Sequence, residues 1–297
     1  LLQAQIHSEL DQLEEANQIY QTALETTVSG YGESDSTTLS VLDIYGQFLN
    51  SIDPEMAEPI LTEALRLSDK DDPQRAYRMK ALGLNLKEMG KIDEAEKMLN
   101  ESLNVFQTVI GEKDADTLAA MATLAKLYMS QGKLKPAKKL FEEALPLMLE
   151  VLDDKNLLIL ESKENLGEIF RQQGSFSQAE KFFQETIIDA TAEYGNEEQL
   201  VIQAKSHLAQ LYEDTGKLNK ALALHQQVYE TDLAMLGENH PNTAGDLNNL
   251  ASVRRRLGDY QIAENLFRKS LEIMVSALGE DSPQSVSVMN NLALLLE

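Results

Sequence analysis

The chain has 297 residues, of which 43% are hydrophobic, so it is long enough to bury a continuous core. Its 26 Lys and Arg residues are outnumbered by 49 Asp and Glu residues, and the net charge of −23 argues against nucleic acid and anionic membrane surfaces as partners. The absence of cysteine excludes disulfides, thiolate metal sites and thiol nucleophiles. Because this composition suits a reducing compartment, we expect a cytoplasmic protein.

No apolar run reaches the roughly 18–20 residues that span a bilayer, and the first residues, LLQAQIHSELDQLEEA, lack the basic and apolar regions of a signal peptide. The chain opens on Leu rather than Met and stops inside an apolar helical pattern. We therefore expect it to be a fragment of a longer polypeptide.

One helical phrase recurs along the whole chain. Looser copies surround Ala16 (LDQLEEANQIYQTAL) and Ala57 (PEMAEPILTEAL). Five closer copies have the form GKIDEAEKMLNESL, and their alanines, 42 residues apart, are Ala95, Ala137, Ala179, Ala221 and Ala263. These copies predict seven equivalent helices, each the second helix of a repeat.

A second periodic segment precedes each copy. In the segment 116–132, Met121, Leu124, Ala125 and Tyr128 fall on one helical face. Prolines mark the starts of three such segments, at Pro73, Pro241 and Pro283, and the capping residues Asp72 and Ser282 precede two of them. No strand pattern competes, so each repeat is predicted to be a pair of helices.

The Gly-x-aromatic/aliphatic-x-x-Ala-x-x-Leu/Phe signature, together with a small residue in each first helix, resembles the tetratricopeptide repeat. The small residues are Ala125, Gly167, Ala209, Ala251 and Ala293. The 42-residue period and the connector LGENHPNT followed by LNNLA resemble the long repeats of kinesin light chains. The resemblance implies an all-α, right-handed α-solenoid of about seven helix-turn-helix repeats that spans 1–297 as a single domain.

Two places depart from this pattern. The interval from Ala57 to Ala95 is 38 residues, so we expect a local change of superhelical curvature near 51–75. The connector is also degraded at 151–158, where it reads VLDDKNLL.

Adjacent asparagines stand inside the predicted helix 241–257. Its apolar face, with Leu247, Leu250 and Ala251, is expected to face the second helix, and Asn248 and Asn249 lie off that face. By the resemblance, this other side lines the concave groove. Reading along it in steps of 42 residues gives Asn165, His207, Asn249 and Asn291, with Asn248 and Asn290 in the neighbouring column.

An Asn amide offers both donors and an acceptor, so a row of them is able to hold the backbone of an extended peptide. Basic residues at groove-facing positions are expected to attract acidic side chains of that peptide: Lys80, Lys87, Lys126, Arg171, Arg255 and Arg256. The stripe of Glu161, Glu164 and Glu168 makes the middle of the groove negative and favours a ligand of mixed charge. Two alternatives stay open: the asparagines are solvated, or they bond the neighbouring first helix and set the superhelical pitch.

The four histidines are few and scattered along the chain, and the sequence indicates no metal site. His207 stands in the Asn column as a polar, pH-sensitive contact or as a tolerated substitution. His240 is assigned to the turn before Pro241, and His225 to the core. The sequence has no phosphate-binding Gly-rich loop, no His pair at i, i+4 and no Gly-x-Ser-x-Gly turn, so we expect neither an enzyme nor a cofactor.

The sequence therefore predicts a protein–protein interaction module that binds a short linear peptide or partner segment in its concave groove, in an adaptor role. The alternative is a structural scaffold that self-associates through its terminal repeats or its convex face and has no groove ligand.

Overall fold

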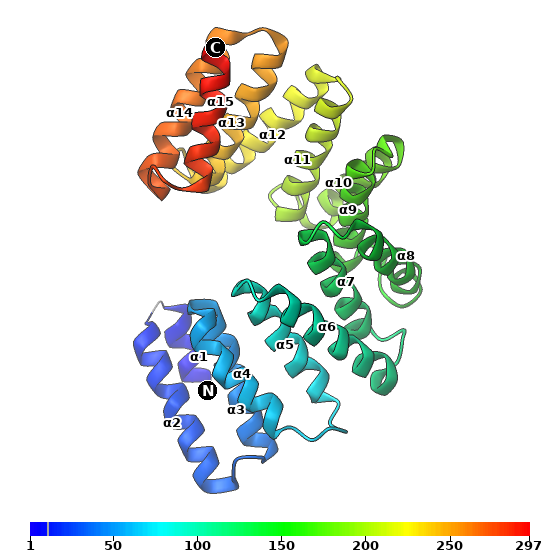
Figure 1. Cartoon of the computed structure of the whole chain (residues 1–297), viewed down its shortest axis with the longest axis vertical. Helices are drawn as coiled ribbons and strands as arrows, with labels where there is room; N and C mark the ends of the chain where they lie inside the picture. The colour runs from blue at the N-terminus through cyan, green and yellow to red at the C-terminus, as the bar shows by residue number, and fades with distance from the viewer. Residues whose placement is uncertain (11) are drawn as a thin grey trace. The chain divides into compact units, whose positions relative to one another are not determined.

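The computed structural model describes residues 1–10 and 12–297, which form fifteen α-helices, one short π-helical segment and no strand (Figure 1). The predicted all-α solenoid of about seven helix-turn-helix repeats is confirmed. The helices fall into two compact units, Leu1–Leu152 and Asp153–Glu297, and the boundary lies at the degraded connector. That the whole of 1–297 forms a single domain stays a prediction.

The first unit contains α1 (Leu2–Glu9), α2 (Leu13–Tyr31), α3 (Ser36–Ile52), α4 (Pro54–Leu67), α5 (Gln74–Glu88), α6 (Ile92–Val105) with the π-helical segment η1 (Phe106–Ile110), α7 (Ala115–Ser130) and α8 (Leu134–Val151). The second unit contains α9 (Leu157–Gln172), α10 (Phe176–Tyr194), α11 (Gln199–Asp214), α12 (Leu218–Leu236), α13 (Pro241–Leu257), α14 (Tyr260–Leu278) and α15 (Pro283–Leu296).

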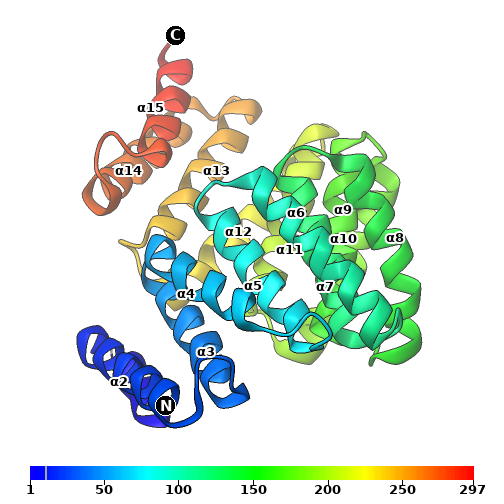
Figure 2. The ribbon, with the colours of Figure 1, turned by 60° about the horizontal axis from the view of Figure 1, so that its bottom comes forward.

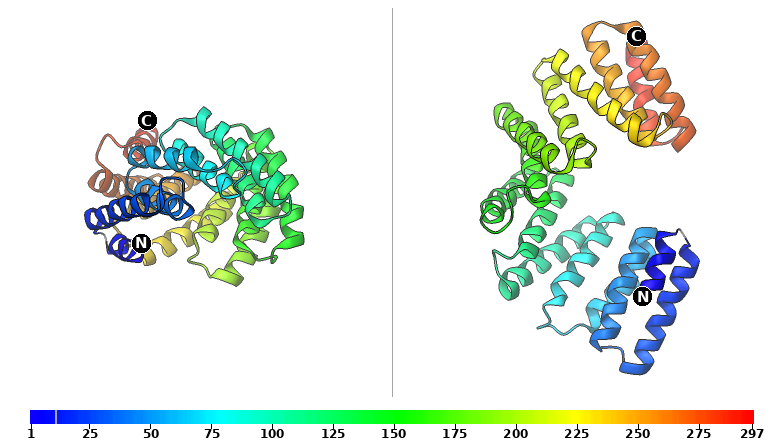
Figure 3. Two further views of the ribbon diagram at one scale, coloured as in Figure 1. Left: turned by 90° about the horizontal axis from the view of Figure 1, so that it is seen from below. Right: turned by 180° about the vertical axis from the view of Figure 1, so that it is seen from behind.

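The even-numbered helices α2 to α14 are the seven predicted second helices. The seven repeat alanines lie one in each of these helices, and all of them are completely buried. The two helices of a repeat pack side by side, as α9 with α10 in Figure 2 and α13 with α14 in Figure 3. The unpaired last helix, α15, packs Val288 and Leu292 into the core formed by α13 and α14.

The predicted helix starts are present as capping contacts. The Asp72 carboxylate accepts from the Gln74 N–H at 2.9 Å, and the Ser282 hydroxyl accepts from the Ser285 N–H at 3.1 Å. His240 caps α13 in the same way, because its Nδ1 accepts from the Asn242 N–H at 3.1 Å. The assignment of His240 to the turn before α13 is therefore confirmed.

The small residue of the first helix is required where the two helices of a repeat approach each other. A Cβ atom added at Gly167 in α9 would lie 2.7 Å from the ring of Phe183 in α10. A Cβ atom at Gly83 in α5 would lie 2.8 Å from Leu99 in α6. Only glycine fits at these two crossings without a shift of the partner side chain, Phe183 or Leu99.

The 38-residue interval between Ala57 and Ala95 corresponds to a short second helix. Helix α4 has 14 residues, whereas α2 and α10 each have 19. The missing turn of α4 accounts for the shortened repeat. The expected change of curvature near 51–75 stays a prediction.

Candidate functional site

The first helices of the second unit lie next to one another. Helix α9 contacts α11, α13 contacts α15, and Arg256 of α13 pairs with Glu213 of α11 at 3.1 Å. Each second helix of this unit also packs against the first helix that follows it. A column read in steps of 42 residues along these first helices therefore runs along one continuous surface. We call this surface the inner face; it is formed by α9, α11, α13 and α15.

Much of the predicted polar row is bonded within the protein. The Asn291 amide donates to the Asn248 Oδ1 at 2.9 Å, which joins α15 to α13. The Asn165 amide donates to the Glu161 carbonyl of its own helix at 2.7 Å. Asn248 and Asn291 therefore act as the pitch-setting alternative requires, whereas Asn165 is bonded only within its own helix. Asn249 is half-buried and Asn290 is exposed, and neither has a hydrogen-bond partner among the described residues.

His207 in α11 bonds the carboxylate of Glu164 in α9, which is only 1% exposed. Burial alone would lower the pKa of His207, but the hydrogen bond and the charge of Glu164 outweigh it and raise that pKa above the usual value. His207 therefore joins two successive repeats through a charge-assisted contact. His225 is buried, as predicted, and its Nε2 lies 3.0 Å from Glu213.

The expectation that Glu161, Glu164 and Glu168 make the middle of the groove negative is wrong for two of the three residues. Glu164 and Glu168 are buried: Glu164 contacts His207 of α11, and Glu168 contacts Arg171 of its own helix, α9. Arg171 in turn lies 2.5 Å from Asp214 of α11. The hydrogen bond to Glu168, against the opposing effect of burial, raises the pKa of Arg171.

The other predicted basic residues differ in their surroundings. Arg256 is paired with Glu213 at 3.1 Å, and Lys87 with Glu88 at 2.9 Å. Lys126 is exposed and Arg255 is half-buried. Lys80 lines a cavity of about 300 Å³ bounded by α3, α4 and α5, and burial lowers its pKa.

One cavity of the second unit contains a predicted site residue. It has a volume of about 390 Å³, is lined by residues of α11, α12, α13, α14 and α15, and includes Asn249. Its amide side chains are Gln199, Gln203, Asn242, Asn249 and Gln284. In the part of the chain that the structure describes, none of these five amides has a hydrogen-bond partner. We call this space the amide cavity.

Two carboxyl groups in the wall of the amide cavity were missed by the sequence analysis. Asp232 of α12 and Asp246 of α13 are each 7% exposed and contact each other. Burial first, and then the charge of Asp232, raise the pKa of Asp246 to about 8; burial also raises the pKa of Asp232. The repeat pattern contains a signal for them, because the equivalent positions 42 residues away are apolar or small: Ala190 and Met274 for Asp232, and Ala204 and Val288 for Asp246.

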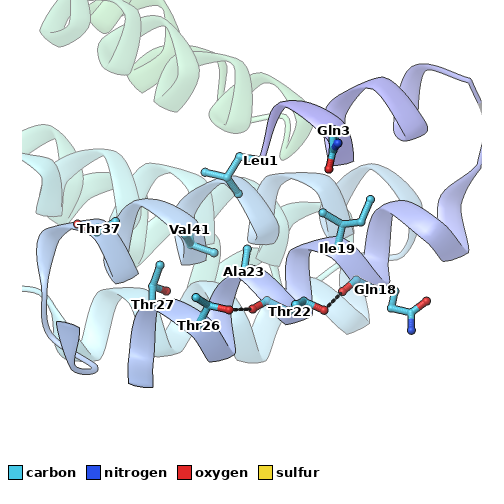
Figure 4. A pocket seen from close by; sticks show the side chains of 10 residues that line it. All are labelled: Leu1, Gln3, Gln18, Ile19, Thr22, Ala23, Thr26, Thr27, Thr37 and Val41. Atoms are coloured by element: carbon cyan, nitrogen blue, oxygen red, sulfur yellow. Dashed lines mark hydrogen bonds between the residues drawn. The ribbon is translucent and has the colours of Figure 1, made fainter. Parts of the chain in front are cut away.

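A larger cavity, of about 620 Å³, lies between α1, α2 and α3 (Figure 4). Part of its polar lining is engaged, since the Thr22 hydroxyl donates to the Gln18 carbonyl and the Thr26 hydroxyl to the Thr22 carbonyl. The side-chain amides of Gln3 and Gln18 have no partner among the described residues. We take the amide cavity as the candidate site because it contains the predicted residue Asn249 together with two buried carboxyl groups.

Within 1–10 and 12–297, no group of three or more His, Asp or Glu side chains is arranged to hold a metal ion. None of the helices described is both long enough and apolar enough to cross a membrane.

The repeat model described as tetratricopeptide repeat matches residues 74–150, 129–187, 156–234, 200–274 and 243–297. The chain belongs to the tetratricopeptide repeat family. Members of this family are typically non-enzymatic and bind other proteins. No curated protein sequence matches the chain.

Solved structures share the fold at low sequence identity. A putative kinesin light chain from Podosopora anserina, with nearly identical TPR-like repeats, is 20% identical over 69% of this chain and 96% of its own, with a TM-score of 0.60. BtubC (BKLC) from P. vanneervenii is 21% identical over 86% and 92%, with a TM-score of 0.62. The apo quorum sensor NprR from B. thuringiensis is 16% identical over 99% and 78%, with a TM-score of 0.69. The predicted likeness to kinesin light chain repeats is confirmed at the level of the fold.

Proposed function

We propose that the chain is a protein-binding module that holds an extended segment of a partner protein in the amide cavity of its second unit. The observation that carries this proposal is the set of five side-chain amides that border one cavity of about 390 Å³ and are not used in bonds within the described chain; four are exposed and Asn249 is half-buried, so they are open to a ligand. Each amide is able to donate to a peptide carbonyl and accept from a peptide N–H. The volume falls within the range of about 300–1,000 Å³ that is typical of ligand pockets.

The predicted site residues take two roles in this proposal. Asn249 is a direct contact to the ligand backbone, because it lines the cavity and is free to bond. Asn165, Asn248 and Asn291 support the inner face, since their amides are bonded within the protein. Arg171 and His207 likewise join neighbouring first helices. Lys80 and Arg255 remain candidate contacts outside the amide cavity.

A selection from a library of random displayed peptides tests this proposal. The wild-type chain is expected to enrich a set of peptides that Asn249→Ala binds about tenfold or more weakly, since the substitution removes both a donor and an acceptor. Asn265→Ala, on the exposed surface of α14, is the matched control and should keep the wild-type affinity. The proposal is wrong if no peptide is enriched or if Asn249→Ala binds the same peptides equally well.

The scaffold alternative also has an observation in its favour. Helix α15 exposes Leu294 and Leu296, and α1 exposes Leu2 and Ile6. Terminal repeats with apolar outer faces favour association with further helices. Light scattering over a range of protein concentrations tests this alternative: an increase in mass that Leu294→Glu with Leu296→Glu abolishes would support self-association, and a constant monomer mass would contradict it.

A further inference from the structure

The carboxyl pair of the amide cavity differs from most of the other buried charges; the exception is Lys205, whose ammonium group donates to the Asn196 Oδ1 at 3.1 Å. Glu164 contacts His207, and Glu168 contacts Arg171. The buried Arg78 contacts Asp43 and Asp72. Each of these ions has a partner of opposite charge. Asp232 and Asp246 instead contact each other, and no Lys or Arg side chain lines their cavity.

Packing does not account for these two acids. The equivalent pair one repeat later is Met274 with Val288, which lies in an apolar core cluster, and one repeat earlier it is Ala190 with Ala204, which are both buried. In the neighbouring repeats, the contact equivalent to that of α12 with α13 is therefore packed with apolar side chains. Two carboxyl groups in their place destabilise the folded chain, because burial opposes ionisation.

The pair also has unused bonding capacity. The Oδ2 atom of Asp246 is buried without a hydrogen-bond partner among the described residues. When the cavity is empty, repulsion between two adjacent carboxylates is relieved by a proton held on the pair. A cation that enters the cavity is able to take the place of this proton.

We propose that Asp232 and Asp246 bind a basic side chain, an arginine or a lysine, of the segment that the amide cavity holds. This inference rests on the proposed function and names the chemistry of its partner. A guanidinium or ammonium group supplies the counter-charge that the pair lacks, and its donors satisfy carboxylate oxygens. The net charge of −23 attracts a basic segment over a longer range.

A metal ion fits this site less well than a basic side chain. Within the described chain, no third His, Asp or Glu is placed to complete a metal site with the two carboxylates, whereas a hard cation favours a richer set of charged oxygen ligands. The amides that surround the pair are instead suited to the peptide backbone on either side of the basic residue.

Binding of the basic side chain is expected to depend on pH. The titratable groups at the cavity are Asp232 of α12 and Asp246 of α13, with His240 near the start of α13; the residues that α11, α14 and α15 contribute are uncharged. Because the ligand displaces a proton from the carboxyl pair, affinity should rise by up to about tenfold per pH unit on going from about pH 6 to pH 8.

The test uses the full chain and the random displayed peptides described above. The wild-type chain is expected to select peptides with Arg or Lys at one fixed position, and Asp246→Asn should lose that preference. Asp281→Asn, the same change on the exposed surface, should keep it. The best peptide is then synthesised with citrulline in place of arginine, or acetyl-lysine in place of lysine, and should bind the wild-type chain about tenfold or more weakly.

The outcomes separate this inference from the proposed function. Peptides that depend on Asn249 but carry no fixed basic residue would overturn the inference and leave the proposed function standing. The same holds if the neutral peptide binds as tightly as the basic one, or if affinity is flat between about pH 6 and pH 8. If no peptide depends on Asn249, the proposed function and this inference both fail.

Discussion

At the scale of single residues, two glycines of first helices respond oppositely to the same change. Gly167→Ala should destabilise the chain by about 1–3 kcal/mol, because the new Cβ atom would lie 2.7 Å from the Phe183 ring. Gly245→Ala should stabilise it by about 0.5–1 kcal/mol, because the nearest atom, Met274 Cε, lies 3.8 Å away and alanine favours the helix. Chemical denaturation of both variants measures the difference, and effects of the same sign would contradict the packing that the structure shows.

The contact between His207 and Glu164 should stabilise the chain more at low pH than at high pH. The pKa of His207 is higher in the folded chain than in the unfolded chain. The stabilisation from this contact is therefore fully present below about pH 6.5, the pKa of an unfolded His, and is lost as the pH rises through the pKa of His207 in the folded chain. His207→Gln should therefore lower stability by about 1–3 kcal/mol in acid and by less in base. Thermal melts of the wild type, His207→Gln, Glu164→Gln and the double variant measure the coupling between the two side chains. A coupling that does not change with pH would contradict the charged contact.

At the scale of helices, the crossing of α12 and α13 is predicted to be less stable than its neighbours in base. The pKa of Asp246 is raised to about 8 in the folded chain, so the folded chain keeps a proton that the unfolded chain releases at lower pH. The stability of the chain is therefore highest below the unfolded pKa of Asp246 and falls as the pH rises to about 8. Asp246→Asn should raise the melting temperature by a few degrees at about pH 9 and change it little at about pH 4. Asp281→Asn is the control. Equal shifts at both pH values would show that the buried carboxyl does not ionise in this range.

The helices themselves could be predicted from the sequence because each repeat carries its own local signals. The seven alanines, the prolines at helix starts and residues such as Gly167 are determined by contacts within one repeat, and one repeat can be compared with the next. The candidate site could be predicted only in part. Asn249 was predicted, but the bonds from Asn291 to Asn248 and from His207 to Glu164 join residues 43 positions apart, so they depend on how successive repeats are stacked.

The two acids of the amide cavity show a second reason for the incomplete prediction. Asp232 and Asp246 lie on different helices, and each appears in the sequence as an ordinary acidic residue in a chain that has 49 of them. Their distinction is that the equivalent positions in neighbouring repeats, such as Met274 and Val288, are apolar. Comparison of columns across repeats finds such residues, whereas a search for local motifs does not.

At the scale of the whole molecule, the second unit is expected to fold and bind by itself. Stability in repeat proteins comes from each repeat and its nearest neighbours, and about three repeats are sufficient for an independent fold. The segment 153–297 contains three helix pairs, α9 to α14, and ends with α15, which buries Val288 and Leu292 against the last pair. Residues of α11 to α15 line the amide cavity. The fragment should therefore give a helical circular dichroism spectrum with a cooperative melt, and it should bind a peptide selected by the full chain with the same affinity.

A shorter fragment, 153–278, is the matched control for this prediction. It lacks α15, so the side chains of Phe267 and Met274 lose part of their cover, and Gln284 is removed from the cavity. The shorter fragment should melt at a lower temperature and bind the peptide more weakly than 153–297. If 153–297 is unfolded, stability is not confined to nearest neighbours as the solenoid requires. If it is folded but does not bind, the ligand needs the first unit, where Lys80 lines a separate cavity.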